Sequence, residues 1–328
     1  MVWYFRLTTM QNESHRLWPL IAGTKFADSY IIDYDNYYFN NYNKLVENFE
    51  NIPKDKIILI DKSCEHLHDN NPNNIKKLNY FLETYNCKHN AVVLDNTYDE
   101  HYFQMFNIKH IKAPFYIFHY LAKNNLKVPQ WNSKVNYTFV CLNNTHKPHR
   151  QEFIEQLQIR GILEKTKWSY RQTIESNVIP TPKFLDQNVG SFNQDANLQQ
   201  LYQNALLALV TETDYYSNNI THVTEKTLWS IFYGCIPIVV GVPGSIALLK
   251  NWGIDVYDDI VDHMYDTETN NKKRMTIIVD QCEKLLYERY PEKIKNLLPV
   301  RVLRNQLLLS NKDYWKTQIQ RELWNYKY

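Results

Sequence analysis

The sequence has little of what usually marks a metal site, a disulfide framework or a membrane protein. Its five cysteines form no C-x-x-C pair and are widely dispersed: Cys64, Cys87, Cys141, Cys235 and Cys282. This pattern argues against a zinc site or disulfide scaffold and favours a reducing compartment. No stretch approaches the roughly 20 apolar residues of a membrane helix. Residues 1–7 are too short for a secretory signal and are interrupted by Arg6. We therefore expect a cytoplasmic protein.

The chain also lacks a strong net charge. The 37 basic and 35 acidic residues leave +2, and nucleic-acid binders are usually more basic. Nucleic acid is therefore a possible but not a favoured partner. With 44% hydrophobic and 22% charged residues the chain is globular, and 328 residues predict two domains at roughly 150 residues each.

Glycine is scarce, and its distribution is informative. Only seven glycines occur, and four of them fall within twenty residues: Gly234, Gly241, Gly244 and Gly253. Glycine is used where the backbone turns sharply or approaches another group closely. This region is therefore the first place to look for a site.

Apolar strand-like runs alternate with helical patterns along two successive stretches. The first contains strands at 2–7, 30–34, 56–61, 91–95 and 108–112, with helices at 37–49, 74–85, 98–106 and 115–123. A linker at 124–134 follows. The second contains strands at 137–142, 205–211 and 236–240, with helices at 150–160, 195–204, 224–233 and 245–252. From residue 272 the chain is helical, and we expect breaks at Pro291 and Pro299. Such alternation predicts an α/β fold of two Rossmann-like domains that face a cleft, with C-terminal helices.

Ligands of open parallel sheets bind outside the carboxyl ends of the strands. Glu212 stands at such an end, and Thr224 can cap the next helix, which leaves Glu225 and Lys226 in its first turn. A helix N-terminus attracts anions, so a lysine there is unfavourable unless an anion binds. Two simpler explanations stay open. Lys226 could be a solvated lysine with no ligand, and Glu225 could serve only to complement the positive end of the helix dipole.

Two neighbouring segments add weaker signals. Residues 241–245 (G-V-P-G-S) join a strand to a helix, but they fit neither the dinucleotide-binding nor the P-loop pattern, and a simple tight turn is equally compatible. Arg150 begins a helix directly after a strand, where a guanidinium could clamp a diphosphate at two points.

Residues 202–241, with V-T-E-T, H-V-T-E-K and G-C-I-P-I-V-V-G, resemble the signature of the α-1,3-fucosyltransferase family (F-E-N-S, then Y-[IV]-T-E-K, then G-x-[IV]-P-[IV]). They also resemble related uncharacterised viral-type glycosyltransferases. The resemblance implies a GT-B-like fold, with residues 1–134 as the acceptor-side domain, 135–300 as the nucleotide-sugar-binding domain, and 301–328 as a helical tail that we expect to pack back on the first domain.

The resemblance also assigns residue roles. It implies that Arg150 and Lys226 hold the diphosphate of a GDP-sugar, that Glu225 accepts hydrogen bonds from the ribose, and that Glu212 lies near the sugar. The remaining donor-site positions that it implies are Asn143, Asn144, His222, Thr224 and Gly244. His222 replaces the aromatic residue of the family pattern, and Thr213 replaces its asparagine. Both positions belong to the donor site, so the resemblance does not determine the nucleotide base or the sugar of the donor.

An inverting transfer also needs a base for the acceptor hydroxyl. Asp95 is the preferred candidate, ahead of Asp61, Glu100 and His101, although each could instead be a turn or cap residue. The histidine pairs 66/68 and 146/149 lack a third ligand, so no metal site is expected. The carboxylates of 258–266 predict a solvated acidic turn or donor-sugar contacts rather than glycoside hydrolysis.

The sequence as a whole favours an inverting glycosyltransferase. It would move a fucose-like sugar from a GDP-sugar to a hydroxyl of a glycan, without metal or other cofactor. Two alternatives remain open. One is a glycosyltransferase that acts on hydroxylated bases in DNA, and the other is a catalytically inactive protein that binds sugar nucleotides or glycans.

Overall fold

The structure is a computed structural model that describes residues 17–33, 42–62, 72–95, 101–120, 126–131, 135–143, 145–170, 195–217, 221, 223–287 and 292–327. The chain divides into two compact units. The first comprises Met1–Asn125 together with Asn311–Tyr328, and the second comprises Leu126–Ser310. Each unit is described by itself.

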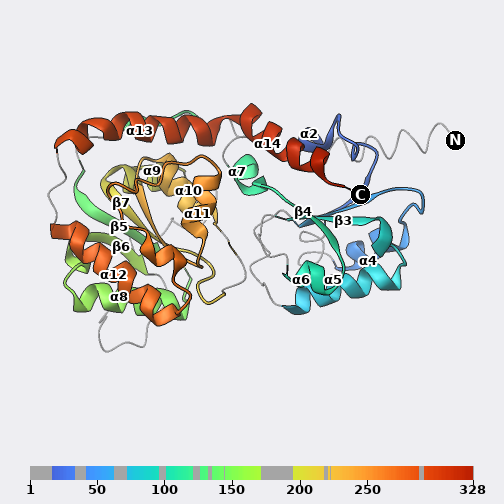
Figure 1. The fold of residues 1–328 in the computed structure, drawn as a ribbon, viewed down its shortest axis with the longest axis horizontal. Coiled ribbons are helices and arrows are strands. Elements are labelled where there is room, and N and C mark those ends of the chain that lie inside the picture. The colour runs from blue at the N-terminus through green and yellow to red at the C-terminus, as the bar shows by residue number, and fades with distance from the viewer. Residues whose placement is uncertain are drawn as a thin grey trace. The chain divides into compact units, whose positions relative to one another are not determined.

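The first unit is built on a parallel four-stranded sheet in the order β1-β2-β3-β4 (Figure 1). Its strands are Tyr30–Ile32, Ile58–Lys62, Ala91–Asp95 and Lys109–Lys112. The helices α4 (Tyr42–Glu50), α5 (Pro72–Thr84) and α6 (His101–Met105) follow the first three strands in turn. One buried cluster joins α4, α5 and α6 to the sheet, through Phe49, Phe81 and Phe103 among others. These three helices therefore cover the same face.

Helix α14 (Lys312–Asn325) belongs to the first unit although it ends the chain. It packs against α2 (Trp18–Ile21), α7 (Phe115–Tyr120) and β4. Trp315, Ile319 and Leu323 are its buried residues, at the four-residue spacing of one helix face.

The second unit contains another parallel four-stranded sheet, in the order β6-β5-β7-β8. Its strands are β5 (Tyr137–Asn143), β6 (Thr166–Tyr170), β7 (Ala205–Thr211) and β8 (Ile236–Val240). The chain runs outward from β5 to β6 and then returns to place β7 on the other side of β5. This reversal creates a topological switch point between β5 and β7, which is where open α/β sheets usually bind ligands.

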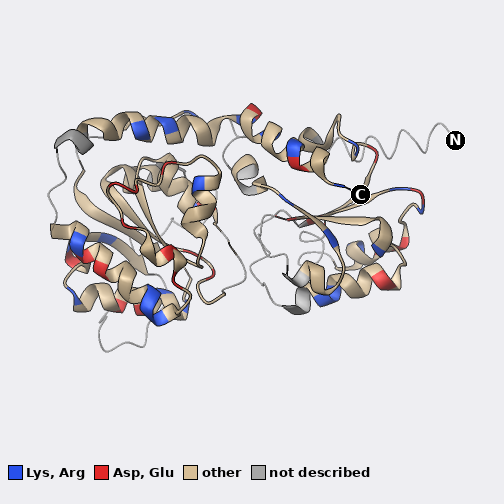
Figure 2. Ribbon diagram, viewed as in Figure 1, with Lys and Arg blue, Asp and Glu red and all other residues tan. Residues whose placement is uncertain are grey.

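Six helices accompany this sheet in the described part of the second unit. They are α8 (Pro148–Ile159), α9 (Asp195–Gln203), α10 (Glu225–Phe232), α11 (Ser245–Asn251), α12 (Asn271–Tyr287) and α13 (Glu292–Ser310). Short 3-10 turns occur at Lys88–Asn90 in the first unit, and at Leu163–Lys165 and Met264–Thr267 in the second. Charges of both signs are spread over the helices (Figure 2). Within the described residues, no helix has both the length and the apolar character of a membrane span.

The predicted architecture of two parallel α/β units followed by C-terminal helices is confirmed. The strands predicted at 91–95, 205–211 and 236–240 have those bounds, and most other elements differ by a few residues at their ends. Strand β6 and helix α2 were not predicted. The strand predicted at 2–7 and the break at Pro291 lie outside the described residues.

The break expected at Pro299 is wrong. Pro299 lies inside α13, and its side chain is exposed. An interior proline removes one main-chain hydrogen bond and crowds the preceding turn. Helix α13 continues because its other residues are anchored. Arg301 pairs with Asp255 and Asp259, and Gln306 donates to the Phe232 carbonyl at 2.9 Å.

Three helices end at glycines with left-handed backbone, as predicted: Gly161 after α8, Gly234 after α10 and Gly253 after α11. At Gly234, with φ +96°, an added Cβ would lie 3.0 Å from Trp131 Cδ1 and 3.2 Å from Val302 Cγ1. At Gly161, with φ +68°, it would meet nothing within 4 Å.

These two glycines separate backbone strain from steric overlap. We expect Gly161→Ala to lower the free energy of unfolding by about 1 kcal/mol, the cost of left-handed backbone in a residue with a Cβ. Gly234→Ala should cost a further 1–3 kcal/mol, roughly, because the methyl group also overlaps Trp131 and Val302. Urea unfolding of both variants measures the difference. Equal losses would show that these neighbours move aside freely.

Candidate functional site

The carboxyl ends of β5 and β7 carry polar residues that bond to each other across the switch point. Asn143 ends β5, is 1% exposed, and accepts a hydrogen bond from the Thr211 hydroxyl at the end of β7. The Asn143 amide also donates to Cys141 Sγ. Asn143 therefore joins the two strands at this edge. Asn144 and His222, also predicted as donor-site residues, lie outside the described residues.

Glu212 directly follows β7, and its carboxylate lies at the start of α10. It is 1% exposed. One oxygen accepts from the Thr224 amide (3.0 Å) and the Thr227 hydroxyl, and the other accepts from the Thr224 hydroxyl (2.6 Å). A carboxylate at this position also complements the helix dipole. Both oxygens of Glu212 are thus engaged, and in this structure the side chain organises the N-terminus of α10.

The first turn of α10 matches the sequence interpretation. Thr224 is the N-cap residue, and its hydroxyl accepts from the Lys226 amide at 3.3 Å. Glu225 is 7% exposed, whereas the Lys226 side chain is 31% exposed. Lys226 Nζ lies 2.5 Å from Glu225 Oε1. Lys226 is therefore a partly exposed cation with one identified carboxylate partner.

Arg150 on α8 is buried and holds the end of β7. Its Nη1 donates to the Thr145 carbonyl at 2.9 Å, and its Nη2 lies 3.3 Å from the carbonyls of both Thr211 and Glu212. Burial lowers the pKa of Arg150, and the carboxylates of Glu212 and Glu225 act in the opposite direction because they lie nearby. The predicted two-point clamp on a diphosphate thus has both Nη groups already bonded to the main chain, and Nε is the guanidinium nitrogen without a partner among the described residues.

Two buried polar atoms in this region have no hydrogen-bond partner among the described residues: Arg150 Nε and Glu225 Oε2. We call them the orphan pair. One is a cationic donor and the other an anionic acceptor. An unpaired buried polar atom typically costs 1–3 kcal/mol, more when charged, so such atoms call for an explanation. A ligand that supplies an acceptor to the arginine and a donor to the glutamate would satisfy both.

The start of α11 is held by a carboxylate of the protein, that of Asp266. Gly244 has φ +84° and donates its amide to the Asp266 carbonyl at 2.8 Å. The two oxygens of Asp266 accept from the amides of Ile246 and Ala247, each at 2.9 Å. The amides of Gly244, Ile246 and Ala247 at this helix start are therefore already bonded to Asp266.

The acidic segment 258–266 is not simply a solvated turn. Asp266 is buried, and burial raises its pKa, although the amides of Ile246 and Ala247 pull in the opposite direction. Asp259 binds Arg301 of α13, and Asp258 pairs with Lys250 at 2.7 Å. These carboxylates have structural partners, and none of these contacts involves the switch-point residues.

Sequence reasoning missed a cluster of stacked side chains beneath the loop that follows β7. The His149 ring stacks on Tyr215 at 5.3 Å, and the Arg274 guanidinium lies over the same ring at 4.3 Å. Arg274 also donates to the Tyr215 carbonyl, and His149 Nε2 lies 3.0 Å from the Glu212 carbonyl. These contacts hold the first residues of the loop, from Glu212 to Tyr215. Arg274 follows two lysines in the run N-N-K-K-R-M, which reads as a solvated helix start and gives no sign that the arginine is buried. Tertiary packing alone defines this cluster.

Asp95 ends β3 in the first unit and is 3% exposed. Asp61, the last residue but one of β2, is fully buried and lies in register with Leu94. In register, Lys62 and Lys112 stand beside Asp95 on the neighbouring strands. In the second unit, His146 Nδ1 lies 2.9 Å from the Tyr170 hydroxyl. No group of three His, Cys, Asp or Glu side chains gathers in metal-binding geometry within the described part of the chain.

Comparisons with other proteins provide no family assignment. The chain matches no protein-family model and no curated protein. A solved structure of the DNA-modifying enzyme β-glucosyltransferase, studied with and without uridine diphosphoglucose, resembles it with a TM-score of 0.42 and 10% sequence identity. That match covers 81% of this chain and 73% of the other. A likeness at this level does not bear on donor or acceptor.

The site generates a pH prediction at His149, whose ring is 2% exposed. Burial lowers its pKa from 6.5 to about 4, and nearby Arg150, Lys147 and Arg274 act in the same direction. The ring is therefore neutral in the folded state, while the unfolded chain takes up a proton below about pH 6.5. The contribution of His149 to the free energy of unfolding is therefore fully present above pH 6.5. It falls by about 3 kcal/mol as the pH drops towards 4.

His149→Phe removes this titration but keeps an aromatic ring against Tyr215. We expect the variant to be less stable at pH 7, because the hydrogen bond to the Glu212 carbonyl is lost, but to lose less further stability between pH 6.5 and 4 than the unsubstituted protein. Urea unfolding at several pH values makes the comparison. Parallel pH profiles for the two proteins would contradict a buried neutral histidine.

Proposed function

We propose that the protein is a GT-B-like glycosyltransferase whose second unit binds a nucleoside-diphosphate sugar at the switch point between β5 and β7. The observation that carries the proposal is the orphan pair, Arg150 Nε and Glu225 Oε2, which has no protein partner among the described residues. A ribose diphosphate offers what both atoms need. Its phosphate oxygens accept hydrogen bonds, and its ribose hydroxyls donate them.

Lys226 supports the same placement. An ammonium group has three N–H donors, so pairing with Glu225 at 2.5 Å leaves two for phosphate oxygens. The side chain is 31% exposed and is therefore more accessible to a ligand than the buried guanidinium of Arg150. In this proposal Lys226 is the main diphosphate contact, Arg150 contributes Nε, and Glu225 accepts from the ribose.

The proposed chemistry is inverting transfer of the sugar to a hydroxyl. Breaking the bond between the sugar and the phosphate leaves extra negative charge on the nucleoside diphosphate. Lys226, Arg150 and the N-terminal end of α10 would stabilise that charge as it develops. The resemblance to α-1,3-fucosyltransferases makes GDP the first nucleotide to test and a fucose-like sugar the first donor sugar. A glycan hydroxyl is the proposed acceptor.

Nucleotide binding tests the proposal directly. At a hundredfold excess over its Kd, a ligand stabilises the folded state by about 2.7 kcal/mol, so GDP should raise Tm by several degrees. Lys226→Ala should weaken GDP binding about tenfold or more, because a charge-assisted contact is lost. Glu225→Gln should weaken nucleoside diphosphate binding while leaving pyrophosphate binding nearly unchanged.

Lys250→Ala is the matched control, since Lys250 also pairs with a neighbouring carboxylate, on α11 of the same unit. Its thermal shift with GDP should equal that of the unsubstituted protein. UDP, ADP and CMP complete the panel and identify the base. If none of the four nucleotides raises Tm, the transferase proposal fails.

The general base that deprotonates the acceptor hydroxyl is a separate prediction. We propose Asp95, at the carboxyl end of β3, for this role. Asp95→Asn should reduce transfer by two to four orders of magnitude, roughly the value of general base catalysis, and leave the GDP-induced Tm shift unchanged. Release of nucleoside diphosphate from a donor panel, followed by mass spectrometry, measures turnover with and without EDTA.

Three outcomes would each contradict one part of the proposal. Full turnover in Asp95→Asn would exclude Asp95 as the base. Loss of turnover with EDTA would contradict transfer without metal. A normal GDP shift in a protein that turns over no donor with any glycan would indicate an inactive nucleotide-binding protein instead.

A further inference from the structure

An exposed aromatic ring stands on the loop that follows β7, beside the donor site proposed above. Tyr216 is 46% exposed, whereas Tyr215 is 1% exposed and His149 is 2% exposed. The Tyr216 ring packs edge-on against Tyr215 at 5.4 Å and against His149 at 5.8 Å, measured between ring centroids. Buried side chains thus support one side of the Tyr216 ring, and its exposed part is an apolar surface that a ligand can cover.

Hydrogen bonds also fix the backbone beneath this ring. Asp214 Oδ1 accepts from the amide of Tyr216 at 3.2 Å and from that of Ser217 at 3.4 Å. The Tyr215 hydroxyl donates to the Asn271 carbonyl, at the start of α12, at 2.7 Å. A ring that is already held in place loses little conformational entropy when a ligand covers it.

A carboxylate lies beside the same ring. Glu152 comes three residues after His149 on α8, so the two side chains are neighbours on the helix surface, and Glu152 is partly buried. Burial raises the pKa values of Tyr216 and Tyr215, and the Glu152 carboxylate acts in the same direction on both because it lies nearby. Among the described residues, no hydrogen bond or ion pair engages the Glu152 carboxylate or the Tyr216 hydroxyl. Both groups therefore have bonding capacity available.

The arginine of the donor site separates this ring from the proposed ribose contact. The connections β5–α8–β6 and β7–α10–β8 leave the switch point in opposite directions, and right-handed connections then place α8 and α10 on opposite faces of the sheet. Glu225 begins α10, whereas Tyr216 packs on α8 through His149. Arg150 lies between them, because Arg150 and His149 bond to the same Glu212 carbonyl.

This order follows the order of groups in a nucleoside-diphosphate sugar. The sugar is attached to the diphosphate, at the end away from the ribose. If the ribose meets Glu225 and a phosphate meets Arg150, the sugar end of the donor, where transfer takes place, lies towards Tyr216.

We propose that Tyr216 and Glu152 form a platform that binds a pyranose ring at the site of transfer. The C–H face of the sugar would lie on the Tyr216 ring, and two neighbouring hydroxyls would donate to the oxygens of Glu152. Two sugars meet at such a site, that of the donor and that of the acceptor, and the chemistry of the platform is the same for both. This inference rests on the proposed function, because it assigns residues to a sugar of that reaction.

The nucleotide base is the competing occupant, because bases also stack on aromatic rings. It fits less well at Tyr216. In the proposed arrangement the base is attached to the ribose at Glu225, on the α10 side, and the diphosphate lies between that ribose and the α8 side. Stacking of the base on Tyr216 would require the ribose to leave Glu225.

Calorimetric titration of the full chain tests the proposal in two arms. The donor arm compares GDP-fucose, GDP-mannose and UDP-glucose, each with its own nucleoside diphosphate. The acceptor arm titrates the neutral disaccharides lactose and maltose without nucleotide. We expect a sugar-dependent gain in at least one arm, that is, tighter binding of a nucleotide sugar than of its diphosphate, or binding of a disaccharide at millimolar concentration. The arm that shows the gain identifies which sugar covers the platform.

Substitutions then locate this gain. Tyr216→Ala should weaken sugar binding by roughly five- to tenfold because the ring contact is lost, whereas Tyr216→Phe should retain most of it. Glu152→Ala should weaken sugar binding by about tenfold, the value of a hydrogen bond to a charged group. The affinity for the nucleoside diphosphate alone should stay the same in all three variants.

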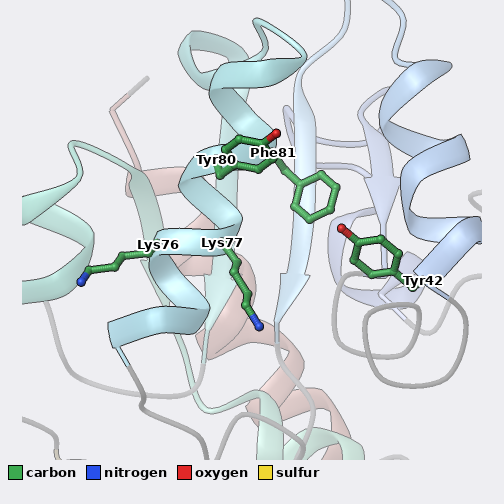
Figure 3. Close-up of a pocket in the computed structure, with 5 residues that line it drawn as sticks. All are labelled: Tyr42, Lys76, Lys77, Tyr80 and Phe81. Carbon is green, nitrogen blue, oxygen red and sulfur yellow. The ribbon is translucent and has the colours of Figure 1, made fainter.

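Two matched controls come from the same chain. Glu155→Ala removes a carboxylate one turn further along α8, which already accepts from Gln151 at 2.9 Å. Tyr80→Ala removes an exposed ring in the first unit, beside a hollow of ≈ 280 Å³ (Figure 3). The described residues that line this hollow are Tyr42, Lys76, Lys77, Tyr80 and Phe81. Both variants should bind every probe as the unsubstituted protein does.

Four results would each reject the inference. The first is no sugar-dependent gain in either arm, and the second is a gain that survives Tyr216→Ala or Glu152→Ala. The third is a loss in Tyr80→Ala as large as that in Tyr216→Ala. The fourth is weaker binding of the nucleoside diphosphate alone by Tyr216→Ala, which would place the base on this ring. Unchanged Tm values without ligand show that the variants fold.

The two arms separate this inference from the transferase proposal. Disaccharide binding that depends on Tyr216 and Glu152, in a protein that binds no nucleotide, would leave a sugar platform and remove the transferase. Nucleotide binding and turnover that neither substitution changes would leave the transferase and remove the platform.

Discussion

The second unit depends on one buried interaction, the carboxylate of Glu212 at the N-terminus of α10. It accepts from the Thr224 amide and from the hydroxyls of Thr224 and Thr227. These bonds fix where the helix begins relative to β7, and therefore where Glu225 and Lys226 stand. The main-chain carbonyl of the same residue accepts from His149 and Arg150, so α8 is tied to the same point. A substitution at Glu212 would thus move several site residues at once, through structure rather than chemistry.

A second buried carboxylate binds the N-terminus of the next helix, α11, in the same way. Asp266 accepts from two amides of α11, as Glu212 accepts from the start of α10. Acids of the protein already satisfy much of the positive end of both helices. An incoming anion at this edge therefore meets side-chain cations more readily than free amides. This shifts the emphasis of the site from helix termini, as the sequence suggested, to Lys226 and the remaining donor of Arg150.

Much of the fold was predictable because it follows from local patterns. Continuous apolar runs marked β3, β7 and β8. Strands β3 and β8 are buried along their whole length, and β7 is buried except at Leu206. The run T-K-W-S-Y of β6 was missed because its polar residues resemble a loop. Among the described strands, β6 pairs with β5 alone and lies at the edge of the sheet. The N-cap role of Thr224 was also visible, since a threonine before an acidic first turn is a local signal. The carbonyl contacts of Arg150 and the amide contacts of Asp266 join residues far apart in sequence, and no local pattern encodes them.

The charges of the donor-site region nearly cancel, which changes how recognition would work there. Arg150 and Lys226 carry two positive charges, and Glu212 and Glu225 carry two negative ones; of the four, only Lys226 is partly exposed. The sequence had drawn attention to the positive groups, namely the helix N-terminus, Lys226 and Arg150. With the charges balanced, long-range attraction contributes little, and binding relies on directional hydrogen bonds to atoms held in place. The orphan pair provides two such atoms of opposite character. A ligand with only a phosphate would satisfy one of them, and a sugar alone would satisfy the other. A group that joins hydroxyls to a diphosphate would satisfy both, and this is the physical basis for preferring a nucleotide over a simple anion.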